Sequence, residues 1–351
     1  MSNIIKITPL LATHTVAFCG RNFLMGFNLG QYRIDGVLFL APMAGVTDAP
    51  FRRLCRQFGA DYAVGEMLAS APQLRNSRKT LARLKFFDGE YPRVVQLLGA
   101  DPAALSEAFH WAVEAGAEII DFNMGCPAKK VCNVACGSAL MREEAQARKI
   151  LEALGEVSQK CAVPVTLKCR TGWDEAHKNA LQVGHWAEEA GFAMLTVHGR
   201  TRAGAFESQV EYDTIAQVAS ELTIPVVANG DIADANRASA VLRYTGAQAV
   251  MIGRAALGRP WLFKEIKETL RSGVPFELSH KEKVEAILSH RRWHFECYPE
   301  PVAVMTFRKH LLWYLTGWPG FEEVRSDLCQ APDALMQGRC LLDYFKRQGW
   351  L

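Results

Sequence analysis

Apolar runs of strand length alternate with helix-length amphipathic segments through most of this 351-residue chain. Parallel strands need a long crossover connection between them, and that connection is usually a helix. We predict eight strands, at residues 37–41, 62–66, 93–98, 118–123, 165–168, 194–198, 226–229 and 249–252. Eight strands that alternate with helices within about 250 residues are typical of a (β/α)8 TIM barrel, which is an α/β fold.

Glycines punctuate this pattern in a regular order. A glycine that can end a helix in the left-handed conformation precedes every second predicted strand. These glycines are Gly59, Gly116, Gly191 and Gly246. An open doubly wound sheet is the alternative architecture. Its dinucleotide-binding form needs a G-x-G-x-x-G motif after the first strand, and this chain has none there.

Composition is that of an ordinary globular protein, with 49% apolar and 22% charged residues. The ten cysteines are scattered rather than arranged as in small secreted domains, so we expect reduced thiols and a cytoplasmic location. No apolar run reaches the roughly 18 residues that a membrane span needs. The net charge of +3 does not by itself indicate a partner. We therefore expect no membrane association, and no obligate protein partner is evident.

The chain divides into three parts by composition. Residues 1–30 lack acidic residues and any secretory signal pattern, so we expect a disordered extension, with Met25 as an alternative first residue. Residues 31–275 carry the barrel pattern. In residues 280–351 the strand pattern disappears and aromatic residues mix with basic ones, which predicts a smaller all-helical domain. A solvated helical appendage without a binding role is the alternative for this last part.

Polar side chains follow nearly every predicted strand. In a TIM barrel the functional residues lie at these carboxyl ends, and the loops after the seventh and eighth strands form the usual phosphate site. Gly230 and Gly253 would let backbone N–H groups approach an anion, and Arg254 would add a bidentate charge. The other polar residues of this rim are Glu66, Gln96, Asn123, Lys168, Arg170, His198, Arg200, Arg202, Asn229 and Asp231.

A thiol lies in the loop that leaves the fourth predicted strand, at Cys126. Gly125 and Pro127 frame it, and loops that leave strands are where a rigid scaffold carries its chemistry. A thiol of pKa near 8.5 is mostly protonated at neutral pH and can act as a general acid. A buried structural cysteine is the alternative. Cys126, Cys132 and Cys136 lack paired C-x2-C spacing, so we expect no metal site.

A phosphate-anchored ligand with an aromatic head group fits this rim. Gln96, Lys168 and Asn229 would surround the head group of a flavin mononucleotide (FMN), whose ring the loop at residues 42–45 would cover. Lys168 near the N1 and O2 edge would favour the anionic reduced flavin.

The rim motifs together resemble those of the tRNA-dihydrouridine synthases, and most closely the bacterial B subgroup. They comprise residues 41–48 (APMAGVTD), 123–131 (NMGCPAKKV), 168–172 (KCRTG), 198–202 (HGRTR), 229–231 (NGD) and 252–256 (IGRAA). The resemblance runs from about residue 30 to the C-terminus. One departure is the segment 132–136 (CNVAC), where the family usually carries an amide and basic residues.

The resemblance implies FMN-dependent reduction of uridine to 5,6-dihydrouridine in tRNA, at position 17, with NADPH or NADH as the reductant. Cys126 would give a proton to C5 while a hydride reaches C6. The implied FMN-binding residues are Pro42, Met43, Ala44, Gln96, Lys168, His198, Asn229, Gly230, Asp231, Gly253 and Arg254. The expected substrate contacts are Asn123, Arg200 and Arg202 in the barrel and Arg308 and Lys309 in the helical part.

Three other functions remain compatible with the residues. An FMN barrel could reduce a free pyrimidine without RNA. A non-redox barrel could use Lys168 to form a Schiff base with a phosphorylated sugar. A tRNA-binding protein without catalysis is the third, and the departure at residues 132–136 is the one hint of it.

Overall fold

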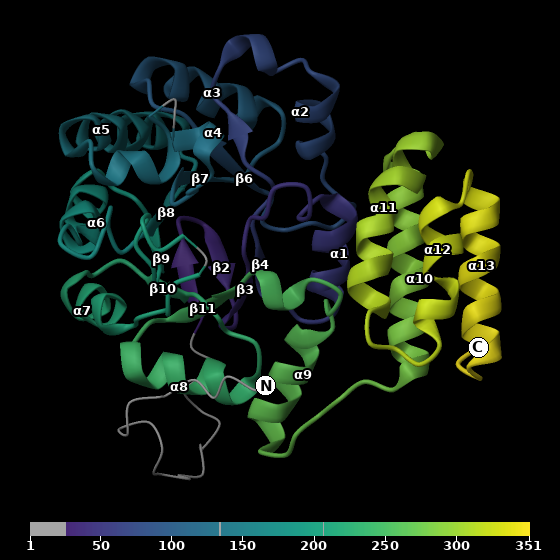
Figure 1. Ribbon diagram of the computed structural model, residues 1–351. Helices are drawn as coiled ribbons and strands as arrows, with labels where there is room; N and C mark the ends of the chain where they lie inside the picture. Colours follow the sequence, from purple (N-terminus) through teal and green to yellow (C-terminus); the bar gives the residue numbers. More distant parts are fainter. Residues whose placement is uncertain (1–25, 133–134, 206) are drawn as a thin grey trace.

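A parallel sheet of nine strands forms the centre of the computed structural model, which describes residues 26–132, 135–205 and 207–351 (Figure 1). In spatial order they are β4 (Tyr62–Ala63), β3 (Leu38–Leu40), β11 (Ala249–Ile252), β10 (Val226–Asn229), β9 (Met194–His198), β8 (Val165–Arg170), β7 (Ile119–Met124), β6 (Val94–Leu98) and β5 (Leu68–Ala69). Each predicted strand is present, and the TIM-barrel prediction is confirmed.

The second predicted strand, at 62–66, is present only as β4, and a further short strand, β5, begins beyond it at Leu68; the sheet closes between the two. β4 pairs with β3, and β5 pairs with β6. Between them Val64 makes a parallel bridge to Val94, and the backbone N–H of Gly65 donates to the Val94 carbonyl at 3.2 Å. The bridge joins the two ends of the sheet, so the architecture is a barrel and not an open doubly wound sheet.

Helices surround the barrel, and the strands run almost entirely buried between them. They are α1 (Ala49–Gln57), α2 (Arg78–Arg83), α3 (Pro102–Glu114), α4 (Lys129–Cys132), α5 (Glu144–Cys161), α6 (Ala180–Glu189), α7 (Asp213–Glu221), α8 (Ala235–Thr245) and α9 (Leu262–Ser272). Helix α3 shows why they begin where they do. The Asp101 carboxylate accepts the Ala104 N–H at 2.7 Å, and Pro102 occupies the first turn, where its missing N–H is not needed.

A short antiparallel hairpin precedes the barrel and consists of β1 (Phe27–Leu29) and β2 (Tyr32–Ile34). Residues 27–30 of the expected N-terminal extension therefore lie in this hairpin. The rest of that extension, up to residue 25, lies outside the described residues.

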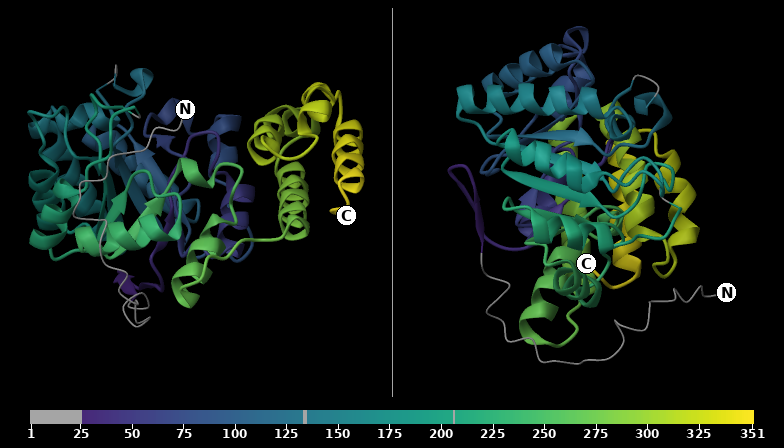
Figure 2. Two further views of the ribbon diagram at one scale, coloured as in Figure 1. Left: turned by 60° about the horizontal axis from the view of Figure 1, so that its bottom comes forward. Right: turned by 90° about the vertical axis from the view of Figure 1, so that its left-hand side faces the viewer.

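Four helices form the C-terminal region beside the barrel, as Figure 2 shows: α10 (His280–Cys297), α11 (Glu300–Leu315), α12 (Phe321–Gln330) and α13 (Ala334–Arg347). They share a hydrophobic cluster that is separate from the barrel core. Leu54 of α1 and Trp261 before α9 also belong to this cluster, so apolar packing fixes the helical region against the barrel. In the three described ranges no helix has the length and apolar character required to cross a membrane.

Candidate active site at the barrel mouth

A cavity of about 1590 Å³ opens at the carboxyl ends of the strands, where the sequence predicted the site. Ligand pockets are usually about 300–1,000 Å³, so this one has room for more than one small molecule. The predicted site residues that line it are Pro42, Met43, Ala44, Gln96, Asn123, Cys126, Lys168, His198, Asn229, Gly230, Asp231, Gly253 and Arg254.

A chain of hydrogen bonds runs from the barrel interior to the backbone of Cys126. The buried Asp121 carboxylate accepts from Gln96 Nε2 at 2.7 Å and from the Thr166 hydroxyl at 2.6 Å. Gln96 Oε1 then accepts from Asn123 Nδ2 at 2.8 Å. Asn123 Oδ1 in turn accepts the N–H of Cys126 at 3.0 Å. Because an ionised carboxylate can only accept, Asp121 fixes the orientation of both amides and so the position of the Cys126 backbone.

Burial raises the pKa of Asp121 to about 6, although the hydrogen bonds from Thr166 and Gln96 oppose this. The carboxyl is therefore mostly ionised at neutral pH but protonates in mildly acidic solution.

Hydrogen bonds to two backbone carbonyls fix the position of the loop around Cys126. The Cys126 carbonyl accepts from the Ser138 hydroxyl at 2.9 Å and from the Ser138 N–H at 3.1 Å. Gly137 has a φ of 61°, and a Cβ there would lie 2.8 Å from that carbonyl oxygen. Arg170 donates to the carbonyl of Gly125 at 2.9 Å. These contacts place a half-buried thiol at the cavity wall.

Burial raises the pKa of the Cys126 thiol, so this group keeps its proton across the neutral range. A protonated thiol in a cavity wall can act as a general acid.

Lys168 and Asn229 meet at the mouth of the barrel. The ammonium of Lys168 donates to Asn229 Oδ1 at 2.9 Å, and Asn229 Nδ2 donates to the Met251 carbonyl at 2.7 Å. Burial and the neighbouring Arg170 lower the pKa of Lys168 to about 8. Lys168 is therefore mostly charged at neutral pH, but its pKa lies only slightly above neutrality.

An acid and two arginines form the end of the cavity near β10 and β11. Asp231 accepts from Arg200 Nη2 at 2.6 Å and from Arg254 Nη2 at 2.9 Å. Burial opposes ionisation of Asp231, but the hydrogen bonds and charges of the two arginines lower its pKa overall. Arg200 is buried and does not line the cavity; Arg254 does, with 54% of its side chain exposed.

His198 lies beside this group as a neutral imidazole. Burial, followed by the charges of Lys168 and the nearby arginines, holds the pKa of His198 well below its usual range. Its Nε2 lies 3.3 Å from Arg200 Nη1. An arginine can only donate, so Nε2 accepts and the imidazole proton is on Nδ1.

The other three expected substrate contacts lie away from the cavity lining. Arg202 packs over the Trp173 ring at 4.4 Å. In the helical region Arg308 donates to the Ala331 carbonyl at 3.2 Å, and Lys309 donates to the carbonyl of Gly45 in the loop before α1.

Known proteins share the sequence pattern of most of this chain. The model of the dihydrouridine synthase (Dus) family matches residues 39–347. This chain belongs to the dihydrouridine synthase family. It is 48% identical over 319 residues to tRNA-dihydrouridine synthase B of Pseudomonas aeruginosa, with 90% of this chain and 95% of that protein covered. The corresponding protein of Pseudomonas putida is 50% identical over 300 residues, with 85% and 88% covered. That of Escherichia coli K12 is 43% identical over 321 residues, with 91% and 98% covered.

In this dihydrouridine synthase family member, further residues at the cavity have roles that were not predicted from the sequence. Arg170 belongs to the predicted polar rim, and its function in holding the Cys126 loop appears only from its contacts. Arg237 and Arg243 of α8 also line the cavity. Both follow the loop after β10, where the phosphate site was expected, and that proximity is the signal that could have indicated them.

The cavity of this family member fits a flavin mononucleotide in size and in charge. Gly253 lines the cavity beside Ala41 and Met43, and a Cβ there would lie in ordinary contact with them, 3.6 Å from the Ala41 Cβ and 3.8 Å from the Met43 sulfur. Lys168 and Arg254 both line this cavity and would place positive charge near the ring edge and the phosphate of such a cofactor, respectively.

Proposed function

We propose that this protein reduces uridine to 5,6-dihydrouridine in tRNA, at position 17, with FMN as cofactor and NADPH or NADH as reductant. The observation that carries the proposal is the half-buried thiol of Cys126, which shares one cavity with Lys168 and Asn229. The curated relatives named above, whose names specify tRNA, support the choice of substrate. The substrate also implies action in the cytoplasm.

In this proposal the protein supplies the proton and the binding geometry. FMN, when bound and reduced, would supply the hydride that adds to C6 of the uracil. Cys126 donates its thiol proton to C5, and the raised pKa of the thiol keeps that proton available at neutral pH. Asn123 orients the Cys126 loop, and Lys168 holds positive charge in the cavity for the anionic parts of the ligand.

The tRNA must present an extruded base to this cavity, because a stacked uridine cannot reach Cys126. The volume of about 1590 Å³ accommodates such a base next to a flavin. We assign contacts to the tRNA backbone to residues 280–351, including Arg308 and Lys309. Arg200 acts on the site through Asp231 and His198, whereas Arg202 lies on the outer rim.

Mapping of dihydrouridine in tRNA from a strain that lacks this gene tests the proposal. We expect one dihydrouridine position to be lost, and to be restored by the wild-type gene but not by Cys126→Ala. Purified protein should carry or take up FMN and should consume NADPH when unmodified tRNA is added. The Ser106→Ala variant, which removes a hydroxyl that bonds only within α3, is the matched control and should restore the position.

Other results would identify the alternatives. Turnover of a free pyrimidine without RNA would indicate a nucleobase reductase. Binding of tRNA without any change in uridine would indicate a protein that has lost catalysis. Trapping of Lys168 by borohydride in the presence of a sugar phosphate would indicate Schiff-base chemistry.

A further inference from the structure

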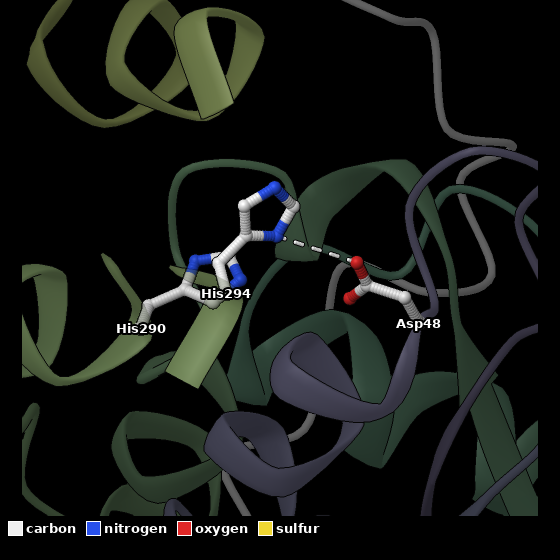
Figure 3. Close-up of side chains that lie close together, drawn as sticks. All are labelled: Asp48, His290 and His294. Carbon is white, nitrogen blue, oxygen red and sulfur yellow. Dashed lines mark ion pairs between the residues drawn. The ribbon is translucent and has the colours of Figure 1, made fainter. Parts of the chain in front are cut away.

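A buried group of one carboxylate and two imidazoles lies where the barrel meets the helical region. Asp48 precedes α1, and His290 and His294 lie one turn apart on α10 (Figure 3). One ligand-type atom of each residue lies within 4.8 Å of the other two, and all three side chains are buried. None of these residues belongs to the cavity at the barrel mouth.

The hydrogen bonds around His294 determine where its proton is. The Thr306 hydroxyl donates its single proton to the Val302 carbonyl at 2.7 Å. Its oxygen must therefore accept from His294 Nε2, which is 2.8 Å away. A neutral His294 then directs the lone pair of Nδ1 towards Asp48 Oδ2, at 3.5 Å. Two electron-rich atoms then face each other, so either a second proton on His294 or a bound cation must lie between them.

The neighbouring imidazoles also have nitrogens without partners among the described residues. His290 Nδ1 bonds to the Tyr314 hydroxyl at 2.9 Å, but its Nε2 has no partner. His310, whose ring centre is 4.7 Å from that of His290, has no partner for either nitrogen. A buried polar atom left unsatisfied costs about 1–3 kcal/mol. Of these histidines, His290 lies with His294 and Asp48 close enough together for the three to share a ligand.

We propose that this group binds one zinc ion through Asp48 Oδ2, His290 Nε2 and His294 Nδ1. Two imidazoles and a carboxylate form a donor set that zinc prefers. Zinc–ligand bonds of about 2.1 Å place tetrahedral ligand atoms about 3.4 Å apart. His294 Nδ1 and Asp48 Oδ2 are already 3.5 Å apart, and the whole group needs to close from within 4.8 Å. A water molecule or His310 would occupy the fourth coordination position of the zinc ion.

The atoms that do not face the ion are already supported, as in known metal sites. Ligating histidines usually donate their other N–H to a neighbouring group. Here His290 Nδ1 lies 2.9 Å from the Tyr314 hydroxyl and His294 Nε2 lies 2.8 Å from the Thr306 hydroxyl, and with zinc bound these hydroxyls would accept the two N–H groups. The Tyr298 hydroxyl donates to Asp48 Oδ2 at 3.0 Å, while Asp48 Oδ1 remains bonded to the Phe51 N–H that begins α1. The ion would thus join α1 of the barrel to α10 of the helical region.

Metal analysis of the full-length protein tests this site independently of any activity. We expect one zinc per chain after purification with zinc present, removal by a chelator, and a lower melting temperature without the metal. Cobalt(II) replacement should give the intense visible bands of a tetrahedral site, without the near-ultraviolet bands of thiolate ligation. X-ray absorption should show nitrogen and oxygen neighbours and no sulfur, which separates this site from metal on the cysteines.

Three variants complete the test. Asp48→Asn keeps a side-chain oxygen to cap α1 but loses the charge, so we expect a folded protein with at least tenfold weaker zinc binding. His290→Gln combined with His294→Gln should abolish binding. His280→Asn changes an exposed histidine on the same helix and should leave binding unchanged. Wild-type protein that binds no zinc, or binds it only through sulfur, would overturn the proposal and leave a proton between His294 and Asp48.

Discussion

Lys168 donates a hydrogen bond of 2.9 Å to the side-chain oxygen of Asn229, which joins β8 to β10 across the intervening strand β9. The bond uses one of the three N–H groups of the ammonium, and Lys168 also lines the cavity. Burial keeps the pKa of Lys168 at about 8, so its charge changes within an experimentally accessible range. The ability of the cavity to hold an anionic cofactor should change in the same range.

The first prediction concerns FMN binding and pH. In FMN-free protein Lys168 is charged below about pH 8 and neutral above it, so affinity for FMN should fall as the pH rises through about 8. Lys168→Gln should bind FMN about tenfold to a hundredfold more weakly at neutral pH, as for a lost hydrogen bond to a charged group. The variant should also lose this pH dependence. Flavin fluorescence titrations at several pH values measure both effects, and the same alkaline decline in Lys168→Gln would rule out Lys168 as its source.

The second prediction concerns the positioning role of Asp121. Below about pH 6 the carboxyl protonates and can donate to Gln96, which permits the amides of Gln96 and Asn123 to reverse. The turnover number should therefore fall as the pH drops through about 6. Asp121→Asn should be slow at every pH and lack this acidic limb. Its stability should not decrease through loss of charge, since an acid with a raised pKa destabilises the fold when it is ionised.

A pH–rate profile of both proteins, with circular dichroism to confirm folding, checks this prediction. An acidic limb of the same midpoint in Asp121→Asn would assign the titration to another group.

The third prediction concerns the support behind Cys126. Gly137→Ala would place a Cβ 2.8 Å from the Cys126 carbonyl oxygen and from Val131 Cγ1, so the loop that carries the thiol must shift. A displacement of about 1 Å at a reacting group can reduce the rate a hundredfold, so we expect a loss of turnover of that order. Gly246→Ala is the control, because it has a similar positive φ of 68° but nothing within 4 Å.

Both variants should lose stability from backbone strain, Gly137→Ala more because of its close contacts, and only Gly137→Ala should lose turnover. Thermal melts and single-turnover reduction of tRNA separate the two effects. Equal turnover in the two variants would show that the position of the Cys126 loop is not critical.

The barrel was predictable from the sequence because each strand is a short apolar run with glycine or proline at its boundary. The closure between β4 and β5 was not, since Gly65 and the bridge of Val64 to Val94 depend on how the ends of the sheet meet. At the site, polar residues after strands were predictable by their position. Asp121 was not, because it lies within a strand and acts through Gln96.

The group of Asp48, His290 and His294 shows the limit most clearly. The spacing of the cysteines predicts no metal site, and none of the proposed zinc ligands is a cysteine. The two histidines are one helical turn apart, a spacing that can bind a metal, but Asp48 is distant in sequence and reaches them only through the packing of α1 against α10. A set of ligands assembled by tertiary contacts leaves no local pattern to read.

The last prediction concerns Arg202 and the outer rim of the barrel. The guanidinium groups of Arg142 and Arg202 lie over the Trp173 ring, at 4.6 Å and 4.4 Å from its centre. The three residues come from the segments after β7, β8 and β9, so they bring two positive charges together on the rim. If this group contacts tRNA phosphates, Arg202→Ala should weaken tRNA binding and reduce the salt dependence of log K by about one contact.

The matched control is Arg148→Ala, because Arg148 is also an exposed arginine but pairs with Glu152 on α5 at 3.0 Å. Its salt dependence should equal that of the wild type. Binding isotherms for one tRNA at several salt concentrations give the slope directly. Since a phosphate contact carries no sequence information, Arg202→Ala should weaken binding to the same extent for different tRNAs. An unchanged slope together with a lower melting temperature would mean that Arg202 stabilises the rim through Trp173 and does not contact the RNA.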